Sequence, residues 1–306
     1  RVRMDVGSLM EREDEMGFAH LLEHLAFRGS TYVPDGEAKR VWQRFGVTFG
    51  SDSNAETSFT HTVYKLDLPN ASRESLDESL KIISGMVSEP GLNQSALTAE
   101  RPVVLSELAE RSGPQMRVQG ASRKLFFAGQ RAASHEPIGT VDTLNGATAT
   151  KLQLFHQRWY RPENTVIVMA GDGNPALFES YIKKHFSSWR GKGEPGVIPD
   201  FGKPNAEDDV ARVIVEPTMP QFISLATVRP WEQVDDTIAY NQQILVDLLA
   251  LQMINRRLEA RARGGGSFLQ ASVSQDDVAR TVDGLFVHIV PLDDNWEAAL
   301  LDVRAV

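Results

Sequence analysis

The sequence is organised around the stretch Gly17-Phe18-Ala19-His20-Leu21-Leu22-Glu23-His24-Leu25-Ala26-Phe27, which is followed by a terminating Gly29-Ser30. Apolar side chains recur along this stretch, and the pattern predicts a largely buried helix from about residue 17 to residue 27. A polar group that is buried without a partner costs free energy. Two histidines and a glutamate inside an apolar helix therefore need a common explanation.

The spacing of these three polar residues suggests one. His20 and His24 are four residues apart, so their imidazoles share one face of a helix and can reach a single metal ion. Glu23 lies at the edge of that face, where a carboxylate can act on a metal-bound water. A metal that activates water, with a carboxylate that transfers the proton, is suited to hydrolysis of peptide bonds.

A third metal ligand has to come from another part of the chain. Glu100 and Glu107 are seven residues apart on a predicted helix and therefore share a face. From spacing alone, either carboxylate can bind the metal while the other supports a ligand. Pro102 lies between them and predicts the loss of one backbone hydrogen bond and a kink.

Length and composition limit the other classes of function. The chain has 306 residues, 42% of them hydrophobic, and a net charge of −9. This length suggests about two globular domains, and the acidic balance argues against nucleic acid as a partner. The absence of cysteine excludes disulfides, cysteine-ligated metals and a cysteine nucleophile. Because no apolar run reaches about 18 residues, we expect no membrane span.

Outside the histidine helix, the pattern predicts a mixture of helices and strands. The charged run from Glu11 to Glu15 predicts a solvated loop, and residues 165–170 predict a buried strand. Further strands are predicted at 1–9, 57–68, 211–216, 221–228, 268–275 and 282–290, and further helices at 37–45, 73–88, 95–112, 148–158, 175–186 and 235–262.

A segment rich in glycine, proline and charge, residues 191–205, predicts a linker. It divides the chain into a metal-binding catalytic domain at 1–190 and a second α+β domain at 206–306. The second part repeats the beginning of the first, so we expect it to be an incomplete homologous domain. The chain has no initial methionine and starts within a strand pattern, so we expect a longer natural protein.

These motifs resemble those of the pitrilysin–insulinase (inverzincin) zinc metallopeptidases, and in particular the large multi-domain bacterial members. The resemblance covers nearly the whole chain: residues 17–30, the segment 54–64, the Glu100 and Glu107 spacing, and residues 161–172. It implies an α+β fold of duplicated units, in which mostly antiparallel sheets are flanked by helices. This is the metallohydrolase fold of the mitochondrial processing peptidase.

The resemblance also implies a role for each residue of the motif. It would make His20, His24 and Glu107 the zinc ligands, Glu23 the general base that activates a zinc-bound water, and Glu100 the residue that orients the ligands. Zinc is therefore the expected cofactor.

Substrate-binding residues are implied in the same way. Asn54 and Ala55 would offer backbone groups to a peptide bound as an added strand. Family members also close the site with an arginine and, seven residues later, a tyrosine, which here correspond to Arg261 and Phe268. Phe268 has no hydroxyl to donate to an oxyanion, and the arginine can alternatively be aligned with Arg257.

The expected function is that of a zinc metalloendopeptidase acting on peptides or unfolded protein segments. The alternative is a non-catalytic peptide-binding or scaffold subunit of the same fold, because the change to Phe268 and the apparent truncation can leave this chain inactive by itself. The expected partners are peptide substrates and either the remaining homologous domains or a partner subunit that closes the chamber. The bacterial relatives suggest a periplasmic location, although the chain shows no signal segment.

Overall fold

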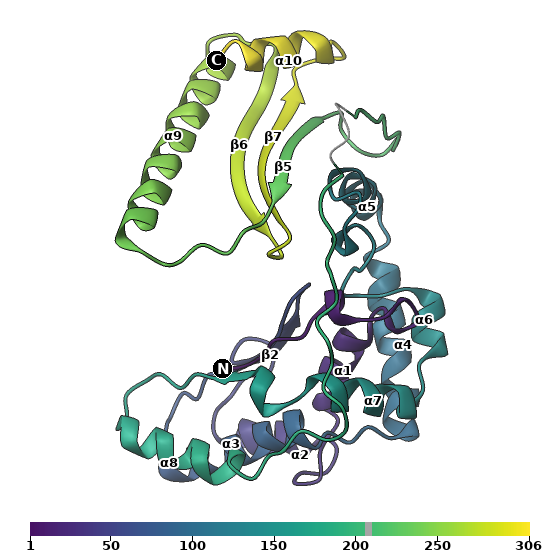
Figure 1. The fold of residues 1–306 in the computed structure, drawn as a ribbon, viewed down its shortest axis with the longest axis vertical. Helices are drawn as coiled ribbons and strands as arrows, with labels where there is room; N and C mark the ends of the chain where they lie inside the picture. Colours follow the sequence, from purple (N-terminus) through teal and green to yellow (C-terminus); the bar gives the residue numbers. More distant parts are fainter. Residues whose placement is uncertain (206–209) are drawn as a thin grey trace. The chain divides into compact units, whose positions relative to one another are not determined.

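The computed structural model describes residues 1–205 and 210–306, which divide into two compact units. Unit 1 comprises residues 1–112 and 134–200, and unit 2 comprises residues 113–133 and 201–306. Both units combine helices with antiparallel strands (Figure 1), which confirms the predicted α+β class. Segment 113–133, which lies within the predicted domain at 1–190, belongs to unit 2 in the structure. The first four residues of the predicted 206–306 domain lie outside the described residues.

The sheet of unit 1 has four antiparallel strands in the order β2-β3-β1-β4. They are β1 (Val2–Met4), β2 (Ser53–Thr57), β3 (Thr62–Leu66) and β4 (Thr165–Ile167). The single strand predicted at 57–68 is wrong, because a turn at residues 58–61 separates β2 from β3. The prediction that 165–170 is buried is also wrong: β4 is an edge strand, and Val166 is 48% exposed.

The helices of unit 1 include a short, mostly buried one, α1. They are α1 (Phe18–Ala26), α2 (Glu37–Arg44), α3 (Arg73–Ser88), α4 (Gln94–Glu110), α6 (Val141–Gly146), α7 (Ala149–Trp159) and α8 (Pro175–Phe186), with 3-10 turns η1 (Ser8–Met10), η2 (Glu13–Glu15) and η4 (Pro162–Asn164). Helix α1 packs against β2, β3, α4 and α7, and eight of its nine residues are buried. Helix α4 is continuous through Pro102.

The charged run at 11–15 is only partly the solvated loop that the sequence predicts, because residues 12–14 are exposed but Glu11 and Glu15 are buried. Glu11 is fully buried, and its two carboxylate oxygens accept the backbone N–H groups of Gly17 at 2.8 Å and Ala19 at 2.7 Å. The first N–H groups of a helix have no partner within the helix and carry partial positive charge. Glu15 is also buried and pairs with Arg158 at 2.6 Å. Glu11 therefore stabilises the start of α1, and Glu15 connects the segment before α1 to Arg158 of α7.

Unit 2 contains a three-stranded antiparallel sheet in the order β5-β7-β6. Its elements are α5 (Pro114–Phe126), η3 (Arg131–Ala133), β5 (Ile223–Pro230), α9 (Ile238–Arg263), β6 (Phe268–Val278), β7 (Val282–Pro291) and α10 (Trp296–Arg304). A small buried cluster joins α9, β6, β7 and α10; its members are Leu258, Phe268, Ile289 and Ala299. The predicted strand at 211–216 is wrong, because these residues form no strand.

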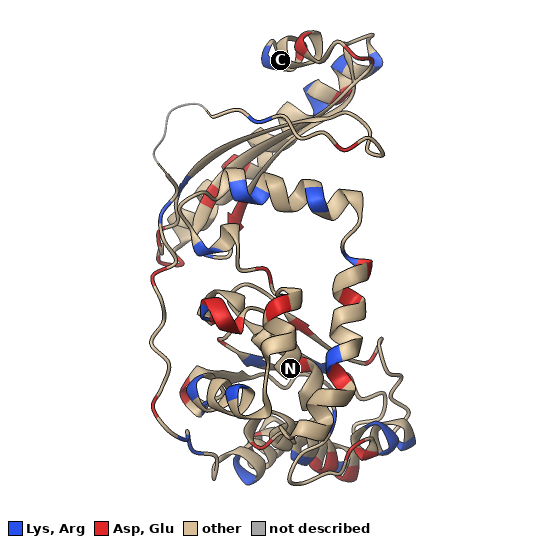
Figure 2. Ribbon diagram, turned by 90° about the vertical axis from the view of Figure 1, so that its right-hand side faces the viewer, with Lys and Arg blue, Asp and Glu red and all other residues tan. Residues whose placement is uncertain are grey.

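Charged side chains are distributed over the helices of both units. Figure 2 shows acidic and basic residues interspersed along the ribbon. Among the described residues, no helix combines the length and the apolar character that crossing a bilayer requires.

Candidate metal centre

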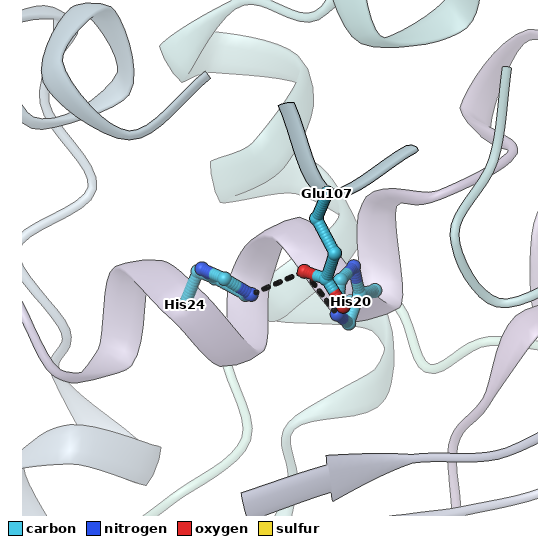
Figure 3. Close-up of side chains that lie close together, drawn as sticks. All are labelled: His20, His24 and Glu107. Carbon is cyan, nitrogen blue, oxygen red and sulfur yellow. Dashed lines mark ion pairs between the residues drawn. The ribbon is translucent and has the colours of Figure 1, made fainter. Parts of the chain in front are cut away.

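Helix α1 places the two histidines side by side. The ring centroids of His20 and His24 lie 4.7 Å apart (Figure 3). The backbone before the helix turns at Gly17, which has a φ of 90° and whose added Cβ would lie 2.9 Å from the Cα of Gly139. Glycine adopts this conformation without a steric penalty and leaves room for the neighbouring chain. The glycine therefore sets the start of the helix that carries the histidines.

Helix α4 brings Glu107 to the same point (Figure 3). Its Oε2 lies 3.6 Å from His20 Nε2 and 3.5 Å from His24 Nε2. Ligands of a tetrahedral zinc, about 2.0–2.2 Å from the metal, are separated from one another by about 3.3–3.6 Å. The three donor atoms therefore fit one metal ion, and two imidazoles with one carboxylate form a donor set typical of catalytic zinc.

Behind His24, a chain of polar contacts fixes the imidazole. His24 Nδ1 lies 2.9 Å from Oε1 of Glu100, whose Oε2 accepts a hydrogen bond from Arg28 Nε at 2.8 Å. A histidine that donates through Nδ1 keeps the lone pair of Nε2 for a metal. The bond to His24 lowers the pKa of Glu100. Burial lowers the pKa of His24, but the nearby carboxylates of Glu100 and Glu23 outweigh burial and raise it.

His20 is more deeply buried than His24. Burial, with smaller contributions from His24 and Arg111, lowers the pKa of His20 to about 3. Its imidazole is therefore neutral at pH 7, which is the form that binds a metal. Among the described residues, its Nδ1 has no hydrogen-bond partner.

Glu23 is buried next to this cluster. Its Oε2 accepts a hydrogen bond from the Thr57 hydroxyl at 2.5 Å. Burial raises the pKa of the Glu23 carboxyl, and the bond from Thr57 opposes that shift. A general base is most effective when its pKa is close to the working pH, so this environment suits proton transfer.

The structure adds three polar contacts that sequence reasoning missed. Thr57 contacts Glu23, Arg28 contacts Glu100, and Arg111 lies 2.5 Å from Glu107 Oε1. Arg111 is four residues after Glu107 in the sequence, and this spacing in a helix predicts an ion pair. Thr57 lies inside the segment that carries the family resemblance, but only the pairing of β2 with β3 shows its position.

The two predicted strand residues lie on β2, at the edge of the unit 1 sheet. Asn54 pairs with Lys65, and Ala55 pairs with Tyr64. The Asn54 side chain accepts the Ala55 N–H at 2.9 Å. Within the part of the chain that the structure describes, β2 pairs with only one strand of this sheet, and Ser53 at its start also forms a single bridge with Phe49.

Arg261 and Phe268 belong to unit 2. Arg261 Nε lies 2.6 Å from Asp302 Oδ1, and the Phe268 ring is 1% exposed within the buried cluster. Both residues therefore contribute to the packing of unit 2. The alternative arginine, Arg257, is exposed on α9.

Two models of one protein family match the chain. The model described as insulinase (peptidase family M16) matches residues 1–133, and the one described as the peptidase M16 inactive domain matches residues 146–286. The chain belongs to the peptidase M16 (insulinase) family. This confirms the predicted family.

Individual relatives agree with the assignment. The probable zinc protease PqqL of Escherichia coli is 28% identical over 304 residues, which are 97% of this chain and 32% of PqqL. This chain thus spans about a third of the length of that relative. The crystal structure of the first half of the periplasmic protease PqqL from Escherichia coli matches with a TM-score of 0.83 at 26% identity, covering 99% of this chain and 65% of that one. Pitrilysin, at 18% identity and a TM-score of 0.76 over 99% of this chain and 33% of its own, shares the fold. The zinc-protease relatives support a peptidase function in general.

Proposed function

We propose that this chain carries the catalytic metal centre of a zinc metalloendopeptidase. The proposal rests on one observation: Oε2 of Glu107 lies within 3.6 Å of Nε2 of both His20 and His24. The names of the relatives support zinc as the metal. The activity would be hydrolysis of peptide bonds in peptides or unfolded protein segments.

In this mechanism His20, His24 and Glu107 hold the zinc ion, which when bound would supply a Lewis acid for water and for the scissile carbonyl. Glu23 accepts the proton of the attacking water and delivers it to the leaving amine. Glu100 keeps the His24 ring in the orientation that ligation requires, and Arg28 holds Glu100.

The substrate would bind as an extended segment along β2. This edge strand offers backbone groups near Asn54 and Ala55, so main-chain hydrogen bonds give affinity with little dependence on sequence. A folded protein does not present such a segment, and this favours peptides and unfolded chains.

The setting is proposed by analogy with PqqL. That relative is described as a periplasmic protease, and we place this protein in the same compartment. Because the chain spans about a third of PqqL, further homologous domains or a partner subunit would complete the enclosure around the substrate.

A second candidate is a peptide-binding subunit without catalysis. It is favoured by Phe268, which has no hydroxyl and lies buried, and by Arg261, which is paired with Asp302. In that case the chain would bind unfolded peptides, and zinc would serve only to stabilise unit 1.

The test compares the purified chain with Glu23→Gln and His24→Ala, using elemental analysis and cleavage of a quenched fluorescent peptide. We expect about one zinc per chain in the wild type and in Glu23→Gln, and loss of zinc in His24→Ala. Glu23→Gln should lower kcat by at least about a hundredfold. Zinc with peptide binding but no cleavage would favour the scaffold, and absence of zinc would contradict the metal centre.

A further inference from the structure

The carboxylate of Glu23 is held from the neighbouring strand. Thr57 is the last residue of β2, and its hydroxyl donates a hydrogen bond of 2.5 Å to Oε2 of Glu23. Among the described residues, Thr57 is the one side chain that donates a hydrogen bond to this carboxylate. The bond joins α1 to β2, which also pack against each other. It is the most direct contact between the edge strand and the residue proposed to transfer the proton.

The surrounding hydroxyl groups leave Thr57 available for this contact. Thr62 lies opposite Thr57 in the β2–β3 pair, and its hydroxyl donates to the Val6 carbonyl at 2.9 Å. A hydroxyl has one proton to donate, so Thr62 is committed to Val6. The 3.5 Å separation between the two threonine oxygens is at the limit of a hydrogen bond. Glu23 is therefore the principal acceptor for the Thr57 proton.

Further hydroxyl groups complete the environment behind Thr62. The phenol oxygens of Tyr64 and Tyr160 are hydrogen-bonded at 2.9 Å, and both rings are buried. Buried, mutually satisfied groups of this kind hold their positions, because rearrangement would leave an unpaired polar atom. The backbone at Thr57 pairs with Thr62 of β3, and the side chains of Thr62 and Tyr64 are themselves hydrogen-bonded.

We propose that Thr57 is a positioning residue that holds Oε2 of Glu23 and leaves Oε1 to accept the proton of the attacking water. Without the hydroxyl, the carboxylate could rotate about its terminal bond, and this torsion is broad in side chains. A displacement of about 1 Å at a reacting group can reduce a rate by about a hundredfold. Loss of the hydroxyl should therefore act on kcat.

The inference deepens the proposed function and rests on it. Thr57 is two residues after Ala55, so the two side chains lie on the same face of β2. The strand proposed to bind substrate and the residue that orients the base are therefore one rigid element. This arrangement would fix the register between a bound peptide and Glu23.

The test uses three variants of the chain: Thr57→Val, which removes the hydroxyl at nearly constant shape, Thr57→Ser, which keeps it, and Thr60→Val as a matched control. The Thr60 hydroxyl lies in the same hairpin and contacts His61 at 3.3 Å, not Glu23. For each we would measure zinc content, thermal stability, and kcat and KM for the fluorescent peptide. A crystal structure of each zinc-loaded protein would show the orientation of the Glu23 carboxylate.

We expect Thr57→Val to lower kcat by about ten- to a hundredfold with zinc content unchanged and KM within about twofold. Thr57→Ser should restore most of the rate, and Thr60→Val should resemble the wild type. A Thr57→Val protein with wild-type kcat, or a Thr57→Ser protein as slow as Thr57→Val, would overturn the inference.

The crystallographic measurement separates this inference from the proposed function. If the zinc-loaded wild type cleaves nothing, the proposed peptidase activity fails for this chain, while the position of Glu23 still tests Thr57. A rotated or disordered carboxylate in Thr57→Val alone would then support positioning. An unchanged carboxylate in Thr57→Val would refute it.

Discussion

Helices α1 and α9 are both rich in apolar residues, but they are buried to very different extents. Eight of the nine residues of α1 are buried, whereas α9 has 26 residues and only Leu258 is buried. Several apolar side chains of α9 are at least half exposed: Ile238, Leu245, Val246, Leu248, Leu249 and Met253. Helix α1 packs against two strands and two helices, whereas α9 packs mainly against β6.

The difference shows which helix can carry polar chemistry. A buried histidine or carboxylate is tolerated only where neighbouring groups satisfy it, and α1 obtains those neighbours from α4, β2 and the Glu11 segment. Apolar composition is common to both helices and does not predict a site. The neighbouring groups that satisfy buried polar residues distinguish α1 from α9.

The largest difference should appear when one leucine in each helix is replaced by alanine. Leu22 is fully buried, and Leu22→Ala should lower the free energy of unfolding of unit 1 by about 2–5 kcal/mol. Leu249 is 60% exposed, so Leu249→Ala should change that of unit 2 by less than about 0.5 kcal/mol. Hydrogen exchange across a urea series, followed separately in peptides of each unit, measures both values. Equal losses would refute the contrast between the helices.

Acid should affect the buried core of unit 1 through its histidines. His156 is buried and donates to the Val87 carbonyl at 2.8 Å, and burial lowers its pKa to about 4. The unfolded chain, with a histidine pKa of about 6.5, binds this proton first, so stability falls as the pH drops from about 6.5 to about 4. The loss from this residue is about 3 kcal/mol in the metal-free protein.

Chemical unfolding of the metal-free protein at several pH values tests this expectation, with His156→Gln as the comparison. The variant should lose part of the slope between about pH 6.5 and pH 4, while His20 retains its share because its pKa is also lowered. A slope that His156→Gln leaves intact would show that other groups cause the acid sensitivity.

A smaller effect should distinguish how the two helices begin. Helix α1 is capped by Glu11, six or more residues upstream, whereas α9 is capped by its own Thr237, which accepts from Tyr240 N at 3.2 Å. Glu11→Gln removes a buried charge that accepts two N–H groups and should cost about 2 kcal/mol. Thr237→Ala should cost about 1 kcal/mol. The same hydrogen-exchange experiment measures both, and a cost for Thr237→Ala above that for Glu11→Gln would contradict the comparison.

Local signals predicted the helices well and the long-range contacts poorly. Helix α3 runs from Arg73 to Ser88 as predicted, because the Ser72 cap and the apolar periodicity lie within the same stretch. The buried Glu15 could not be anticipated, since its partner Arg158 is 143 residues away. Helices α5, α6 and α10 were not predicted.

In the candidate site, too, local spacing was predictable and long-range contacts were not. The pairing of His20 with His24 follows from helical spacing, and spacing also placed Glu100 and Glu107 on one face. Spacing could not say that Glu107 faces both Nε2 atoms while Glu100 lies behind His24, because that depends on how α4 crosses α1. The position of Thr57 next to Glu23 could not be predicted without knowing how β2 pairs with β3.

Unit 2 is assembled from two separate segments, 113–133 and 201–306, with unit 1 completed by the chain between them. Helix α5 is joined covalently to unit 1 on both sides, yet Phe126 lies beside Phe286 and Gln130 donates to the Thr281 carbonyl. A protease cut after Asp200 would therefore break one peptide bond without releasing an intact half. The two fragments would share unit 2: the fragment 1–200 would keep all of unit 1 but leave segment 113–133 without its partners, and the fragment 201–306 would lack that segment.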